Sequence, residues 1–240
     1  IAQGYLLVAA VSLCCVLCFL LILRDPPVSQ EELPPLMPLG QALVSFVQPL
    51  RAKEFGLTFA SRCCAYLAFT ILGAYTLFYL RGVLHEALPI AALHVANFQL
   101  LSTAVLIIFA LVAGWFSKRT GQIKCFVIGG GLLMALGLAV IVVIPTWTAL
   151  LVAAVIFGAG FGLYLGVDIA LAIRVLPSEQ ARGKDLGLMY DAIYLPLILS
   201  PLIGGGVLNV FHNNFALLFA IAALASVLSG VLIIPLKTVQ

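Results

Sequence analysis

Three ionisable side chains lie well inside long apolar stretches of this 240-residue chain: Arg62, Asp168 and Asp191. A charge within a bilayer costs about 2.5–3.5 kcal/mol on insertion scales, so such residues usually pair with one another or mark a path for ions or substrates. Burial disfavours the charged form of a carboxyl group, whereas a nearby arginine favours it. One hypothesis is proton exchange at one carboxylate, with Arg62 as its counter-ion. The sequence is equally compatible with a static ion pair or with an arginine that reaches the lipid headgroups.

The helical rise places these charges at one depth. Asp168 precedes Arg174 by six residues and Asp191 follows Lys184 by seven. At 1.5 Å per residue, Asp168 lies about 9 Å from the C-terminal end of its helix and Asp191 about 10 Å from the N-terminal end of the next, and these two ends lie on the same side of the membrane. Arg62 lies at a similar level, so it can pair with either acid, and the sequence leaves this choice open.

Several polar and aromatic residues are candidates for contact with a substrate. Residues spaced by four share a helix face, so Tyr66 and Thr70 lie on the face of Arg62, and Tyr164 lies on the face of Asp168. Such side chains suit a sugar or an amphipathic drug; hydrogen bonding between helices and anchoring at the membrane interface are the alternatives. The candidates are Tyr66, Thr70, Asn97, Gln99 and Tyr164.

The elements that carry these residues are long apolar segments. The chain is 64% hydrophobic and 9% charged, with a mean hydropathy of +1.22, whereas soluble domains are about 45–50% apolar and about 25% charged. A helix that crosses a bilayer needs about 20 mostly apolar residues. We predict an all-α, polytopic membrane helix bundle with seven transmembrane helices at 1–23, 57–80, 93–116, 125–144, 148–172, 186–208 and 215–236.

The connections between these helices predict the orientation of the chain. Residues 24–56 form a proline-rich linker, and the other connections are short. Almost all basic residues flanking the spans fall on one side, and only Arg81 falls on the other. The positive-inside rule therefore places the linker and the C-terminus in the cytoplasm, and Ile1 on the outer side.

Residues 114–124, GWFSKRTGQIK, are expected to form a short basic turn on the cytoplasmic side. This segment resembles the cytoplasmic signature of the major facilitator superfamily of transporters, G-x-x-x-D-[RK]-x-G-[RK]-[RK]. Gly114, Arg119 and Gly121 match this signature, whereas Lys118 stands where the pattern has aspartate. The segments GAGFGLYLGVDIALAIRVLP (158–177) and GKDLGLMYDAIYLPLILSPLIGG (183–205) are similar to the tenth and eleventh helices of bacterial members.

The resemblance implies the C-terminal half of a transporter. Residues 1–23 would be the last helix of an N-terminal half, 24–56 the central cytoplasmic linker, and 57–240 the six-helix C-terminal half. Because the chain enters an apolar span at Ile1, we expect that the N-terminal half is missing from this sequence. The resemblance also implies alternating access in a bacterial plasma membrane, with substrate bound between the halves.

The family's signature aspartate helps to latch the cytoplasmic face. Since Lys118 replaces it, we expect Lys118 or Arg119 to pair with Asp185 at the start of the helix at 186–208, which reverses the usual polarity. Such a pair at the interface is worth about 0–1 kcal/mol.

The expected function is therefore secondary transport of a small molecule, drug-like or sugar-like, with H+ as a further partner. The alternative is a seven-helix membrane receptor. An enzyme ranks last, because no Ser/His pair and no His/Asp metal spacing occur, and we expect neither a cofactor nor a metal. Basic tracts with interleaved aromatic residues are absent, so nucleic-acid binding has no support.

Overall fold

The computed structural model describes residues 2–22, 38, 46–176 and 182–236, and it divides the chain into two compact units, Ile1–Gln41 and Ala42–Gln240. The first unit contains one apolar helix, α1 (Ala2–Ile22). The division falls inside the predicted linker, most of which lies outside the described residues, as does the end of the chain at 237–240.

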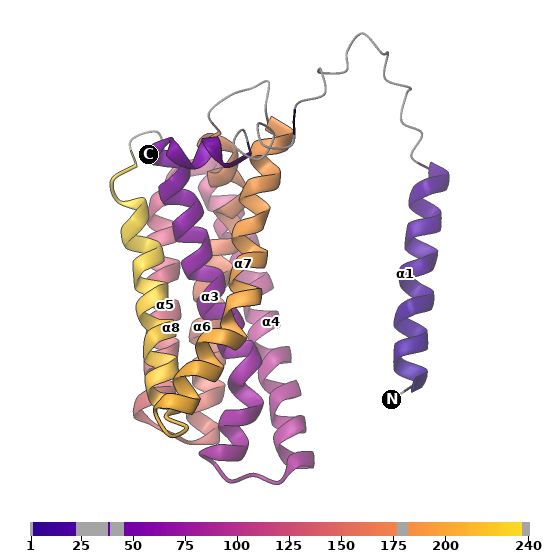
Figure 1. The fold of residues 1–240 in the computed structure, drawn as a ribbon, viewed down its shortest axis with the longest axis vertical. Coiled ribbons are helices and arrows are strands. Elements are labelled where there is room, and N and C mark those ends of the chain that lie inside the picture. The colour runs from indigo at the N-terminus through magenta and orange to yellow at the C-terminus, as the bar shows by residue number, and fades with distance from the viewer. Residues whose placement is uncertain (1, 23–37, 39–45, 177–181, 237–240) are drawn as a thin grey trace. The chain divides into compact units, whose positions relative to one another are not determined.

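The second unit is a bundle of six long helices (Figure 1). Short connections join them, so that each helix runs opposite to the one before it. The described residues contain helices and no strands, which confirms the all-α prediction for that part of the chain. After a short 3-10 turn, η2 (Gln48–Arg51), the helices are α3 (Lys53–Gly82), α4 (Leu88–Thr120), α5 (Ile123–Val143), α6 (Trp147–Arg174), α7 (Arg182–Val210) and α8 (Phe215–Ile233).

All six helices of the bundle are long and apolar enough to cross a membrane. In α1 the apolar stretch whose side chains are described, Leu6–Ile22, is shorter than that length. The prediction of seven spans is thus confirmed for six of them, and for the first the side chains of Leu6–Ile22 are described.

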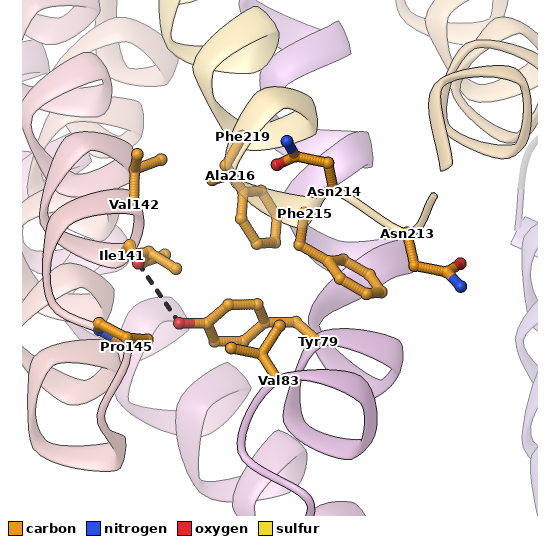
Figure 2. Close-up of a pocket in the computed structure, with 10 residues that line it drawn as sticks. All are labelled: Tyr79, Val83, Ile141, Val142, Pro145, Asn213, Asn214, Phe215, Ala216 and Phe219. Atoms are coloured by element: carbon orange, nitrogen blue, oxygen red, sulfur yellow. Dashed lines mark hydrogen bonds between the residues drawn. The ribbon is translucent and has the colours of Figure 1, made fainter. Parts of the chain in front are cut away.

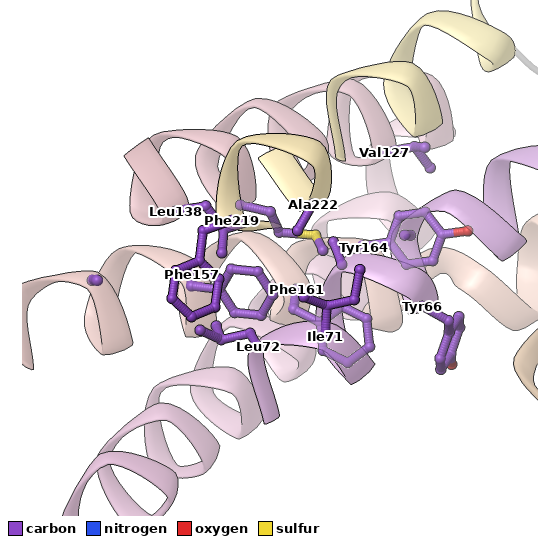
Figure 3. Close-up of a cluster of buried hydrophobic side chains, with 14 of the residues drawn as sticks. Tyr66, Ile71, Leu72, Val127, Leu138, Phe157, Phe161, Tyr164, Phe219 and Ala222 are labelled. Carbon is purple, nitrogen blue, oxygen red and sulfur yellow. The ribbon is translucent and has the colours of Figure 1, made fainter. Parts of the chain in front are cut away.

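Helix α6 forms the centre of the packing, because it lies against both α4 and α5. Helix α8 packs on α5 and α3, and α7 packs mainly on α3. Figure 3 shows the buried side chains where these helices meet, among them Phe157, Phe161 and Tyr164 of α6, with Ile71 of α3 and Phe219 of α8. This core packs side chains of α3, α6 and α8 together.

Glycines at every fourth position of α6 bring its backbone against α4. A Cβ atom at Gly158 would lie 2.6 Å from the carbonyl oxygen of Ser102, and one at Gly162 would lie 2.5 Å from that of Leu106. Gly166 makes the same kind of backbone contact one turn further on. The G-x-x-x-G spacing therefore allows the close approach of the two helices.

Helix α7 bends in its second half (Figure 1), where Pro196 and Pro201 lie inside the helix. Each proline removes a backbone donor, which is a common cause of a kink. The Tyr75 hydroxyl of α3 donates to the Pro201 carbonyl at 3.1 Å. Gly204 leaves room for the Tyr75 ring, because a Cβ atom there would overlap it. The bent helix is thus held against α3.

The basic segment 114–124 differs from the prediction of a turn. Helix α4 continues to Thr120, and the connection to α5 consists of Gly121 and Gln122 alone. Gly121 caps the helix with φ of 73°, the left-handed conformation that glycine adopts without strain. Lys118 and Arg119 therefore lie in the last helical turn, where positive charge complements the helix dipole.

Candidate functional site

A buried ion pair joins α3 to α6 in the bundle. The Arg62 Nη2 atom lies 2.7 Å from Asp168 Oδ2, and the two side chains are 4% and 2% exposed. Of the two acids that the sequence offers as partners of Arg62, the structure selects Asp168. A buried arginine that lost this partner would be an uncompensated charge in an apolar interior.

Further contacts link this pair to Tyr66 on α3 and to two neighbouring residues on α7. The Tyr66 hydroxyl, one turn after Arg62, donates to Asp168 Oδ2 at 3.5 Å. The Arg62 Nη1 atom donates to the carbonyl oxygen of Met189 on α7 at 3.3 Å. The guanidinium carbon also lies 5.6 Å from the centre of the Tyr190 ring. The pair therefore connects three helices.

Aromatic rings of α6 pack around Tyr66, whose hydroxyl donates to the carboxylate. The Tyr66 ring meets Phe161 edge-to-face at 5.4 Å and Tyr164 at 6.5 Å between ring centres. The Tyr164 side chain is fully buried, and its hydroxyl has no hydrogen-bond partner among the described residues. Asp168 thus sits in a largely apolar setting with one cation and one hydroxyl beside it, which suits a carboxyl group that exchanges a proton.

Asp191 lies on α7, two residues beyond Met189, and its side chain is exposed. Within the described structure no ion pair links it to Arg62. Two helical residues correspond to a rotation of about 200°, which turns Asp191 away from the face that meets Arg62.

The polar substrate candidates do not gather around the ion pair. Asn97 and Gln99 are exposed on α4. The Thr70 hydroxyl donates within its own helix, to the Tyr66 carbonyl at 2.9 Å and the Leu67 carbonyl at 3.1 Å. Only Tyr66 and Tyr164 of this group lie beside Asp168.

The expected pairing of Lys118 or Arg119 with Asp185 is absent from the described part of the chain. Arg119 lies over the Trp115 ring at 4.1 Å, and Lys118 is exposed. Asp185 is 2% exposed, and the ion partner found for it is its neighbour Lys184, at 3.9 Å. Asp185 is buried on a helix that packs mainly on α3, whereas the two cations lie on the exposed end of α4. Gly114 lies inside α4, where a Cβ atom would come 3.4 Å from the Gly166 carbonyl oxygen.

Two hollows of the bundle lie away from the ion pair. Figure 2 shows one of about 260 Å³ between α3, α5 and α8, where the Tyr79 hydroxyl donates to the Ile141 carbonyl at 3.3 Å and Asn213 and Asn214 line the edge. A groove of about 560 Å³ between α5 and α8 is lined by apolar side chains alone. Neither hollow offers charged groups, so the ion pair is the candidate site.

Sequence reasoning missed the contacts that fix this site. The acceptor of Arg62 on α7 is a main-chain carbonyl, which any residue type carries, so no sequence signal marks Met189. The sequence also gave no reason to join His94 to Glu86, whose carboxylate lies 2.8 Å from the imidazole Nδ1. That imidazole stacks on Trp147 at 3.8 Å, where α4 begins near α6. The described residues contain no group of three side chains placed to hold a metal ion.

Comparison with known proteins identifies the fold. The family model for the Major Facilitator Superfamily matches residues 62–239. A crystal structure of a mutant of the peptide transporter POT with sulfate is 20% identical, with a TM-score of 0.64; the match covers 76% of this chain and 37% of that one. The same transporter with alafosfalin is 20% identical, with a TM-score of 0.65 and coverage of 82% and 42%. No curated protein gives a significant match.

This chain spans less than half the length of those two transporter chains. The family match covers most of the sequence, including Arg62, Asp168 and all but the first turns of α3. The solved structures share the arrangement of the bundle. The chain therefore belongs to the Major Facilitator Superfamily and is an integral membrane protein.

Proposed function

We propose that this chain is the C-terminal half of a secondary active transporter that carries small molecules by alternating access. Family membership supports this, as does a bundle that aligns with about two fifths of two peptide-transporter chains. In this proposal residues 1–23 are the last helix of an N-terminal half, 24–56 are the cytoplasmic linker, and 57–240 form the six-helix half. The partner half lies outside this sequence.

The observation that carries the coupling proposal is the buried contact of Arg62 and Tyr66 with Asp168. With Asp168 ionised, the salt bridge joins α3 to α6. A proton taken from water by a carboxylate oxygen neutralises Asp168, while Arg62 keeps its charge throughout. The attraction between the two helices then weakens, so proton occupancy shifts the balance between conformations. A ligand shifts such a balance only through different affinities for the two states.

The proposed substrate is a small drug-like or sugar-like molecule. Polar Asn97 and Gln99 and aromatic Tyr190 are exposed on the half described here. Aromatic faces with a few polar groups suit amphipathic compounds and sugars. Peptides belong in the same test, because the structural neighbours are peptide transporters.

We place the protein in a bacterial plasma membrane with its C-terminus in the cytoplasm. Lys118 and Arg119 at the end of α4, Lys124 at the start of α5 and Arg174 at the end of α6 share one end of the bundle, which supports this orientation. We also propose that the end of α4, with Gly114 and Gly121, takes part in a cytoplasmic latch. Its partner is then a part of the protein other than Asp185.

Uptake by proteoliposomes tests the proposal, using the complete natural protein that contains this chain. We expect at least one of a dipeptide, a hexose and a cationic dye to accumulate when the lumen is alkaline relative to the medium, or to be extruded under the opposite gradient. A protonophore should abolish the movement, and protein-free liposomes are the control. Specific binding of a compound that never crosses the membrane would contradict transport and favour the receptor alternative.

A further inference from the structure

Three buried polar atoms near the start of α3 and α7 have no hydrogen-bond partner among the described residues. They are Thr58 Oγ1, Arg62 Nε and Asp185 Oδ1. The Thr58 and Asp185 side chains each belong to residues that are only 2% exposed. Buried polar atoms are normally paired, so such a group asks for an explanation. Here a cationic donor and an anionic acceptor are both incompletely satisfied.

The register of α3 against α7 brings these atoms together. The two helices run in the same direction, and Arg62 contacts the Met189 carbonyl while Tyr75 contacts that of Pro201. Thirteen residues along α3 thus match twelve along α7, so the pair keeps one register. Asp185 precedes Met189 by four residues, one turn on the same face, about 6 Å along the helix. Asp185 therefore lies one turn from the guanidinium, beside Thr58, which precedes Arg62 by the same spacing.

Asp185 is only weakly paired in this conformation. Its ion partner is the adjacent Lys184, whose Nζ lies 3.9 Å from Oδ1, beyond hydrogen-bond distance. Lys184 is about a third exposed. A carboxylate in the first turn of a helix is favoured by the helix dipole. That fixed role accounts for an acid at this position, but it leaves the unpartnered Oδ1 atom unexplained.

We propose that Asp185 is the second partner of Arg62, which moves to it from Asp168 when Asp168 takes up a proton. This inference rests on the proposed proton coupling. A buried guanidinium needs a nearby carboxylate, and Asp185 is the one that the register places within reach along the α3–α7 contact. The exchange replaces an α3–α6 salt bridge by an α3–α7 salt bridge, so protonation changes which helix α3 holds.

The groups that face this exchange come from each of the three helices. Tyr66 of α3 bonds to Asp168, and Tyr164 of α6 lies one turn before that carboxylate. Tyr190 of α7 lies against the guanidinium in the observed position. Each of these groups carries a phenol hydroxyl. Among the described residues, Asp185 and Lys184 of α7 are charged groups near the second position, and Glu54 of α3 lies one turn before Thr58.

A double-mutant cycle on the complete protein tests the exchange. Asp168→Asn and Asp185→Asn each leave one carboxylate for Arg62, whereas the double variant leaves none. We expect the unfolding equilibrium constant of the double variant to rise about tenfold beyond the product of the two single effects, since coupled neighbours deviate from additivity. If Asp185 acts only through the helix dipole, the unfolding equilibrium constant of the double variant changes by the product of the two single effects. That result overturns the inference.

Two further variants keep the test decisive. Asp168→Asn combined with Asp191→Asn is the matched control, because Asp191 is an exposed acid on the same helix, and its effects should multiply. If the Asp168/Asp185 double variant does not fold, the change Arg62→Met is added to it. Removing the buried cation should then restore folding, whereas a triple variant that stays unfolded contradicts the exchange.

The cycle and the transport measurement fail independently. Suppose that the single effects on the unfolding equilibrium constant simply multiply and that Asp168→Asn loses proton movement. The role of Asp185 is then overturned, and the proposed coupling stands. If proton movement persists in Asp168→Asn, the proposed coupling is overturned, and the exchange is overturned with it. This holds even if the cycle shows that Asp168 and Asp185 are energetically coupled.

Discussion

The variant Arg62→Met is expected to lose about 3–5 kcal/mol of unfolding free energy, because it leaves the Asp168 carboxylate buried without its cation. Adding Asp168→Asn should recover most of this loss, since the uncompensated charge is then gone while Tyr66 keeps an acceptor. Both changes are read from SDS titrations of the purified protein in mixed micelles. The recovery distinguishes a charge effect from loss of the arginine's packing.

The control for this prediction is Arg81→Met, at the other end of α3, where the side chain is exposed. It should change the unfolding free energy by about 0.5 kcal/mol or less, as is usual for surface positions. If Arg62→Met is as mild as Arg81→Met, or if Asp168→Asn brings no recovery, the pair is not held as a buried salt bridge.

The second large effect is expected for Gly166→Leu, at the contact of α4 with α6. A Cβ atom at this position already lies 2.9 Å from that of Ala113 and overlaps the Ala110 carbonyl oxygen. Forcing a larger side chain into a well-packed contact costs about 1–3 kcal/mol, and more where backbone must move. The separation of α4 and α6 should also increase, which distance measurements between spin labels on the two helices can detect.

Gly129→Leu on α5 is the matched control, because a Cβ atom there meets nothing within 4 Å. Leucine has a higher helix propensity than glycine, so this change should be neutral or stabilising. Equal losses for the two variants would show that glycine is needed for something other than the approach of α4 and α6.

The fold could be predicted from the sequence because lipid imposes a strong constraint on it. Backbone groups must pair within each segment, so a long apolar run implies a helix. The spans predicted at 186–208 and 215–236 place a short connection between them, and in the structure it lies between Val210 and Phe215. The prediction that residues 114–124 form a turn was wrong, because basic residues end the apolar run but do not end the helix. Gly121, with its positive φ, ends the helix.

The site was only partly predictable. Arg62, Asp168 and Tyr66 were found because charge is rare in lipid and residues four apart share a face. The choice between Asp168 and Asp191 depends on the rotation of α7, which hydropathy does not report. The predicted latch failed for the same reason: Asp185 faces inward on α7, whereas Lys118 and Arg119 lie exposed on α4. Contacts to main-chain atoms, such as that of Arg62 with Met189, leave no trace in residue types.

Proton movement by Asp168→Asn tests the central proposal most directly. Proteoliposomes that contain a pH-sensitive dye are given a transported compound, and the change in lumen pH is compared with the uptake of that compound. We predict that Asp168→Asn exchanges the compound across the membrane while its proton movement falls to that of protein-free liposomes. Asp191→Asn, whose acid is exposed and not paired with Arg62, should keep its proton movement. A wild-type ratio of protons to compound in Asp168→Asn would contradict the proposal.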